Sequence, residues 1–302
     1  MATEKGFLKG LIFRLVKKHI AGSTADSAIR MALKLNAGKV HTSITFLNES
    51  PRDSAQVRYN VNAYMQLMRQ ISRLHAKADV SLRPSQFGYH LGNGIFAKGL
   101  EEIAEKADEA QIDVWVESES ARSAHDILDT FETCGSKRLG IEIPKSEIYD
   151  KSVCDRCRRS GVKIKISDYA DAAANESGKS GGAKKSKKRD RAREPLLEDV
   201  LKLFKGRSAV ISSSDERSVY RAIKSGNASK KSIVFETLYG ISPKRIRRLI
   251  KDNINVSIYI PYGKDWVPFA IKRLTEGHIR DIAVAILDGE AKRTVDRDGE
   301  GD

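Results

Sequence analysis

The stretch "IYIPYGKDWVPFAIKRLTEG", residues 258–277, changes its character in the middle. Its first part has alternating apolar residues around Tyr259 and ends at the Pro-Tyr-Gly turn of residues 261–263. This pattern is typical of a β-strand closed by a turn. Its second part begins near Asp265 and has the pattern of a helix. The stretch is therefore predicted to be one strand followed by one helix.

The same strand-and-helix unit is repeated along the chain. Further strand patterns occupy residues 40–49, 78–88, 112–119, 138–145, 162–169, 208–216 and 232–240. Amphipathic segments such as "PKRIRRLIKDN" (243–253) lie between them. Strands that alternate with helices indicate parallel βαβ units. Eight such units in 302 residues predict the α/β class and a closed (β/α)8 TIM barrel.

The domain organisation follows from this repeat. We expect N-terminal helices over residues 1–36 and the barrel over residues 37–290. The Gly/Ser-rich and then basic run "NESGKSGGAKKSKKRDRARE" (175–194) is typical of a disordered insert. Residues 291–302 read as a charged, flexible tail.

Charge and hydropathy limit the partners and the location. The net charge of +14 favours polyanions, and the basic insert offers nucleic acid as one of them. The sequence contains no apolar run of the length that a membrane span needs. Residues 1–22 have the pattern of a basic amphipathic helix, which either lies on a membrane surface or packs across the closed end of the barrel. We therefore expect a cytoplasmic protein, with a peripheral place at a membrane as the alternative.

The cysteines do not indicate a metal or redox site. Cys154 and Cys157 form a single CxxC on an expected helix, and no second pair of ligands follows at the spacing of a zinc site. We expect both to be structural, and we expect no metal.

The end of the chain supports a more specific interpretation. The pieces "FETLYG" (235–240), "VSIYIPYGKDW" (256–266) and "FAIKRLTEG" (269–277) resemble the closing motifs of the proline dehydrogenase family, in the same order. Earlier pieces such as "VSLRPSQFG" (80–88) agree, and the similarity extends over roughly residues 18–285. The resemblance implies a divergent flavoprotein with FAD as its cofactor. Its reaction in proline catabolism would be oxidation of L-proline to 1-pyrroline-5-carboxylate, by hydride transfer to flavin N5. A quinone or another electron acceptor, possibly at a membrane surface, would take the electrons.

The resemblance also implies the residues that bind the substrate. They fall on Arg83, Glu117, Tyr259, Lys272, Arg273 and Glu276. The three cations would hold the carboxylate of a small amino acid, because a buried unpaired charge is costly. The ring of Tyr259 would pack over the proline ring, Glu117 would pair with Arg83, and Glu276 would belong to an ion-pair gate.

The expected cofactor contacts depart further from the family pattern. They fall on Lys163, Tyr169, Ser213, Ser214, Glu236 and Leu238. A glutamine of the family's fourth strand is replaced by Pro144, which has no N–H to donate. Two functions therefore stay open. One is a flavin enzyme that acts on proline or a related cyclic or secondary amino acid. The other is a non-catalytic barrel that binds an anionic ligand or, through its insert, nucleic acid.

Overall fold

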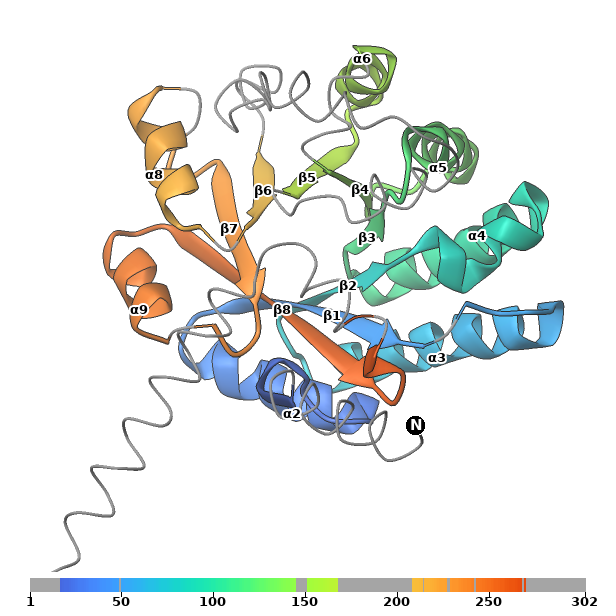
Figure 1. Ribbon diagram of the computed structural model, residues 1–302, viewed down its shortest axis with the longest axis horizontal. Helices are drawn as coiled ribbons and strands as arrows, with labels where there is room; N and C mark the ends of the chain where they lie inside the picture. Colours follow the sequence, from blue (N-terminus) through green and yellow to red (C-terminus); the bar gives the residue numbers. More distant parts are fainter. Residues whose placement is uncertain are drawn as a thin grey trace, which may run out of the picture.

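A computed structural model describes residues 17–48, 50–144, 151–167, 208–213, 215–226, 229–241, 243–267 and 269. Its centre is a closed barrel of parallel strands in the order β1 to β8 (Figure 1). The strands are β1 (His41–Leu47), β2 (Ala78–Leu82), β3 (Val114–Glu117), β4 (Leu139–Pro144), β5 (Lys163–Ser167), β6 (Ala209–Ser212), β7 (Ile233–Leu238) and β8 (Asn255–Gly263). The predicted (β/α)8 barrel is confirmed.

Helices surround the barrel on its outer side, as Figure 1 shows. They are η1 (Lys17–His19), α2 (Ala25–Ala37), α3 (Ser54–Arg73), η2 (Pro84–Phe87), η3 (Tyr89–Leu91), α4 (Asn93–Ala110), α5 (Ala121–Cys134), α6 (Lys151–Ser160), α8 (Arg217–Lys224) and α9 (Pro243–Lys251). The expected insert 175–194 and tail 291–302 lie outside the described residues. The expected domain boundaries therefore stay predictions.

The barrel closes where the first strand meets the last. Ile44 of β1 pairs with Val80 of β2 on one side and with Ile260 of β8 on the other. These three side chains are fully buried and belong to the apolar layer between the barrel and its helices. The residues that alternate with them, such as Ser43 and Ser81, form a hydrogen bond of 2.9 Å between their hydroxyls inside the barrel. Alternation of polar and apolar residues therefore turns one face inward and the other toward the helices.

The helices begin at residues that the sequence provides for this purpose. Thr24 accepts a hydrogen bond from the backbone N–H of Ser27 and caps α2. Asp53 accepts from the N–H of Gln56 and caps α3, the longest of the described helices. Because each cap satisfies backbone donors that the first helical turn leaves unpaired, the helix starts are fixed locally.

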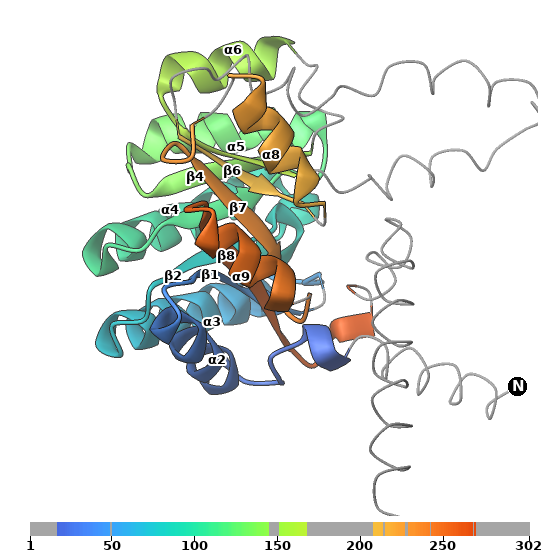
Figure 2. The same ribbon diagram turned by 90° about the vertical axis from the view of Figure 1, so that its left-hand side faces the viewer.

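The segment before α2 lies at the carboxyl-terminal end of the barrel (Figure 2). The N–H of Ala21 donates to the carbonyl of Pro261 at 2.8 Å, and His19 Nδ1 lies 2.7 Å from the carbonyl oxygen of Tyr239. Gly240 makes this approach possible, since its φ is +83° and a Cβ there would lie 2.3 Å from the carbonyl oxygen of Lys18. The expected helix of residues 1–22 is described only from residue 17 on, and this part lies away from the closed end.

Three further points concern the cysteines, membrane spans and metal ligands. Cys154 and Cys157 are buried on α6 as free cysteines and belong to the apolar core. Within the described ranges, no helix combines the length and the apolar character that a bilayer crossing requires. The described residues also contain no cluster of potential metal ligands.

Candidate active site at the carboxyl-terminal mouth

Arg83 lies at the carboxyl end of β2, on the turn into η2. Pro84 is the first residue of this short helix, and Gly88 ends it with a φ of +77°. The side chain of Gln86 fixes the turn. Its Oε1 accepts from the N–H of Arg83 at 3.1 Å, and its Nε2 donates to the carbonyl of Phe46 at 2.6 Å. The "RPSQFG" segment therefore holds Arg83 at the mouth of the barrel by local hydrogen bonds.

Acidic side chains from β3 and the loop after it surround Arg83. Glu117 is the last residue of β3. Glu119 accepts from both the N–H and the hydroxyl of Ser85 at 2.8 Å, which ties the loop after β3 to the loop after β2. Burial disfavours the charge of Arg83, but Glu117 and Glu119 outweigh it and raise the pKa of the guanidinium above its ordinary value. Arg83 is therefore a permanent cation.

Tyr259 of β8 reaches across the barrel to the same place. Its hydroxyl donates to Glu117 Oε1 at 2.7 Å, and the residue is 7% exposed. Tyr259 also acts electrostatically on Arg83. Arg83, Glu117 and Tyr259 therefore lie together, although 176 positions separate Arg83 from Tyr259 in the chain (259 − 83). A cation, a carboxylate and an aromatic hydroxyl meet at one rim.

An ion-pair network lies beneath this rim, in the interior of the barrel. Lys165 of β5 is fully buried, and its Nζ lies 2.8 Å from Glu236 Oε1 and 3.6 Å from Glu142 Oε2. The ammonium also lies 4.9 Å from the ring centre of Trp115 and 6.0 Å from that of Tyr259. Burial opposes its charge, but the carboxylates outweigh burial and raise the pKa of Lys165. Lys165 was not among the residues predicted from the sequence, although its alternation with Lys163 places both on the same face of β5.

An apolar patch forms another part of the mouth. Leu238, at the end of β7, packs with Leu47, Tyr259 and Phe269. Ser213, at the end of β6, is buried, and its hydroxyl accepts from the N–H of Asp215 at 3.1 Å. Leu238 therefore lies in an apolar patch at the rim, and the hydroxyl of Ser213 holds the turn that leads to α8.

Two of the expected cofactor residues form ion pairs inside and below the barrel. Lys163 is the first residue of β5, and it forms an ion pair of 2.5 Å with Asp113, which precedes β3. Glu236 is 1% exposed and bonds Lys165 and Ser257 inside the barrel. Both residues line a cavity at the amino-terminal end of the barrel. Their predicted role as cofactor contacts stays a prediction.

The remaining predicted site residues lie outside the described residues. They are Tyr169, Ser214, Lys272, Arg273 and Glu276. The structure therefore describes the part of the site that β2, β3 and β8 contribute, together with the apolar patch at the end of β7.

Comparison with known proteins identifies relatives of one kind. No family model matches the chain. Proline dehydrogenase 1 of Bacillus subtilis (strain 168) is 20% identical over 268 residues, which cover 86% of each chain. The proline dehydrogenase of Deinococcus radiodurans is 22% identical over 279 residues, which cover 88% of this chain and 87% of the relative.

A solved structure agrees in fold. Proline utilization A (PutA) of Bdellovibrio bacteriovorus, inactivated by N-propargylglycine, superimposes with a TM-score of 0.71 at 17% identity. The match covers 89% of this chain but 33% of that protein, so the chain spans about a third of its length. Over most of its own length, the chain is similar to proline dehydrogenases at 20–22% identity.

Proposed function

We propose that the protein is a dehydrogenase with FAD as the oxidant, which oxidises L-proline to the cyclic imine 1-pyrroline-5-carboxylate or a related secondary amino acid to the corresponding imine. The relatives support the class of reaction. The observation that carries the proposal is the meeting of Arg83, Glu117 and Tyr259 at the carboxyl-terminal mouth. In barrels of this class, catalysis occurs at that end of the strands.

Arg83 is proposed to bind the carboxylate of the substrate. A guanidinium presents two parallel N–H groups to a carboxylate, which fixes its orientation as well as its position. Glu117 and Glu119 keep Arg83 charged and limit the directions in which its side chain points. Tyr259, held by Glu117, would then present its ring to the substrate's own ring.

The charge balance of the described residues indicates that this site needs more cations. Among the described residues of the rim, Arg83 faces the carboxylates of Glu117 and Glu119. Their balance is minus one (1 − 2), and an amino-acid substrate would bring one more carboxylate. Because unpaired buried charge is costly, we propose that Lys272 and Arg273 complete the site and raise the balance to plus one, which the substrate carboxylate then neutralises.

FAD is part of the proposal, and the described residues fit one side of it. When bound, it supplies the oxidant that accepts a hydride from the substrate carbon next to the nitrogen. The apolar patch of Leu47, Leu238 and Phe269 would cover a planar ring. Tyr169 and Ser214 are proposed to provide polar contacts. Since Lys163 and Glu236 are engaged in ion pairs with Asp113 and Lys165, we expect weak FAD binding. A quinone or another acceptor would then take the electrons.

The test begins with the purified protein and added FAD. We expect flavin absorbance to stay with the protein through gel filtration at high FAD, and a dye acceptor to be reduced when proline is added. In Arg83→Met, the KM for proline should rise about 10- to 100-fold, since a hydrogen bond to a charged group contributes about 1.5–3 kcal/mol. Arg156→Met is the matched control, because Arg156 pairs with Asp129 and Glu132 on the outer helices.

Two results would contradict the proposal. One is an unchanged KM for proline in Arg83→Met. The other is a folded parent protein that binds no FAD and reduces no dye at saturating FAD and proline. A parent that still binds proline under those conditions would be the non-catalytic barrel instead. The nucleic-acid alternative rests on residues 175–194, outside the described residues, and no observation on the described part favours it.

A further inference from the structure

The barrel has a large cavity at the end opposite the candidate active site. Its volume is about 710 Å³, within the range of small-molecule sites. Its walls are residues at the beginnings of the strands, among them His41 of β1, Lys163 of β5 and Val234 of β7. It extends inward to Glu236 and Ser257. It is therefore a separate opening from the rim formed by Arg83, Glu117 and Tyr259.

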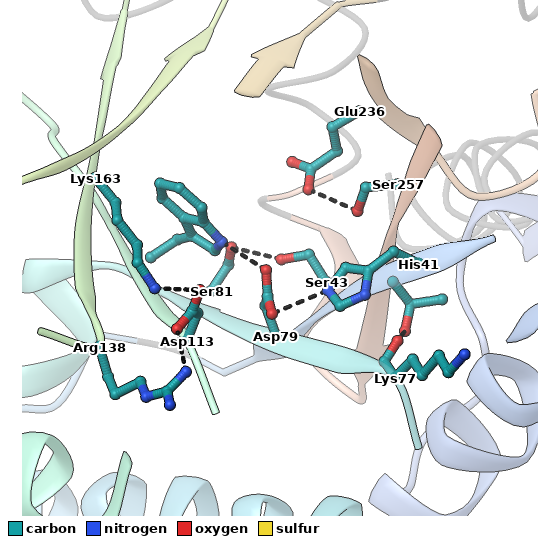
Figure 3. A network of polar contacts seen from close by, with 12 residues as sticks. His41, Ser43, Lys77, Asp79, Ser81, Asp113, Arg138, Lys163, Glu236 and Ser257 are labelled. Atoms are coloured by element: carbon teal, nitrogen blue, oxygen red, sulfur yellow. Dashed lines mark hydrogen bonds and ion pairs between the residues drawn. The ribbon is translucent and has the colours of Figure 1, made fainter. Parts of the chain in front are cut away.

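Two carboxylates lie side by side in this cavity, as Figure 3 shows. Val80 of β2 pairs with Val114 of β3, so that the preceding residues, Asp79 and Asp113, are neighbours on adjacent strands. Both line the cavity, and their side chains are 19% and 24% exposed. Like charges on neighbouring strands repel each other unless cations balance them.

The two carboxylates are balanced differently. Asp113 forms ion pairs with Lys163 at 2.5 Å and with Arg138 at 3.3 Å. Asp79 instead accepts from the neutral indole N–H of Trp115 at 2.9 Å, and its other oxygen lies 2.9 Å from His41 Nε2. Within the described part of the chain, the charge of Asp79 is thus balanced by a direct partner only when His41 is protonated.

The groups that face His41 show which charge the cavity favours. Asp79 from β2, Glu236 from β7 and Asp113 before β3 all act on it, while Lys39 and Lys163 lie on the same cavity wall. Burial disfavours the imidazolium, but the bond to Asp79 and the three carboxylates outweigh burial and raise the pKa of His41. The local potential therefore favours a positive charge beside Asp79.

The rest of the wall is apolar. Ile164, Ala209, Val210, Val234, Ile250 and Val256 line the cavity beside these charged groups. We propose that the amino-terminal mouth of the barrel is a second ligand site that binds a small organic amine. Its ammonium group lies against Asp79 in place of the His41 proton, and its apolar body lies along this wall. The carboxylate of Asp79 uses two of its roughly four acceptor positions, so it has room for an ammonium donor.

The test uses three probes with the same body and different heads. They are 4-phenylbutylamine, the neutral 4-phenylbutanol and the anionic 4-phenylbutyrate, titrated by calorimetry into the full-length protein. We expect the amine to bind at least tenfold more tightly than the other two. Its affinity should rise between pH 6 and pH 9, because His41 gives up its competing proton while an alkylamine with a pKa of about 10.4 stays charged.

Three variants locate the site. Asp79→Asn should weaken amine binding at least tenfold, whereas Asp126→Asn should leave it unchanged, since Asp126 accepts from Tyr89 on the outer surface of the barrel. His41→Gln should bind the amine with little dependence on pH. If Asp79→Asn does not fold, the pH dependence of amine binding in the parent and in His41→Gln tests the proposal instead. Equal binding of all three probes, or an identical pH dependence in His41→Gln, would overturn the proposal.

Discussion

Replacing Lys165 with methionine tests whether the ion pairs inside the barrel are required for folding. The lysine is fully buried, and its ammonium contacts Glu236 at 2.8 Å and Glu142 at 3.6 Å. Methionine keeps the length and the apolar stem of the side chain, so the change removes the charge and little volume. Two carboxylates then remain in the interior without their shared cation.

The expected cost follows from these distances. At an effective dielectric constant of about 20, the two attractions amount to roughly 6 and 5 kcal/mol. Desolvation of the three ions offsets most of this gain, which is why an intact buried pair contributes little net stability. Removing one partner keeps the desolvation of the others without the attraction, at a cost of about 3–5 kcal/mol. At about 2–4 °C per kcal/mol for a domain of this size, Lys165→Met should lower the Tm by roughly 10 °C.

The pH dependence separates this cause from a simple packing defect. In the parent, burial is outweighed by Glu236 and Glu142, and the pKa of Lys165 lies above 10.5. Its stabilisation is therefore complete below pH 10.5 and is lost as the pH rises through the folded-state pKa. In the variant, the uncompensated carboxylates should take up protons more readily. Its stability deficit should therefore shrink as the pH falls from 7 to 5.

Thermal unfolding followed by circular dichroism measures both effects. Lys106→Met is the control, because Lys106 pairs with Glu109 on the surface of α4 and its replacement should leave the Tm unchanged. A Lys165→Met protein that unfolds within 2 °C of the parent at pH 7 would refute the reasoning. A deficit that is the same at pH 5 and pH 7 would assign the effect to packing instead of charge.

Further predictions concern the rim, the amino-terminal cavity and the turn after β7. Tyr259→Phe removes the hydrogen bond to Glu117 and should lower the free energy of unfolding in urea by about 1–2 kcal/mol. An unchanged free energy of unfolding would mean that this hydrogen bond contributes nothing to stability. The NMR titration of His41 should give a pKa above 6.5 in the parent, and this pKa should fall in Asp79→Asn. The ion pair of protonated His41 with Asp79 should therefore stabilise the fold below pH 6.5, and this stabilisation is lost as the pH rises through the folded-state pKa. Gly240→Ala places a side chain on a residue with left-handed backbone and against the carbonyl oxygen of Lys18. It should lower the free energy of unfolding in urea by about 1–3 kcal/mol, and an unchanged free energy would contradict this close approach.

The fold was predictable from the sequence because barrel strands leave a local signal. In β1, "HTSITFL", apolar residues directed at the helices alternate with hydroxyl residues directed inward. Such a pattern fixes which face of a strand is buried, and its repetition with helices between predicts the closed barrel. The turn around Arg83 was equally predictable, because residues within the same motif hold it by hydrogen bonds.

The positions of Lys163 and Glu236 were not predictable in the same way. The alternation in "KIKIS" places Lys163 and Lys165 on one face of β5, but it does not say how far along the barrel axis either one lies. That height depends on the stagger between strands, here the pairing of Lys163 with Gly140 and of Lys165 with Glu142. Stagger is a property of neighbouring strands, which a single motif does not contain.

The amino-terminal cavity was missed for a related reason. Its charged residues His41, Asp79, Asp113 and Lys163 come from four separate strand beginnings. Each has the appearance of an ordinary polar residue at the edge of a strand. A signal was present, because a charged residue at an inward position is unusual in a barrel whose inward positions normally hold Val, Ile and Leu.

The same comparison explains why the interior of this barrel indicates function. Ser81, Lys165, Glu236 and Ser257 are all buried and hydrogen-bonded to one another in the middle of the barrel. Apolar residues of similar size would fold at least as well, since buried ion pairs are weak contributors to stability. The network joins the two ends: Lys165 lies below the ring of Tyr259 at the carboxyl-terminal mouth, and Glu236 lines the amino-terminal cavity. A 2.8 Å ion pair links these two residues. Buried charges that are kept at a cost in stability are more typical of functional sites than of a packed core.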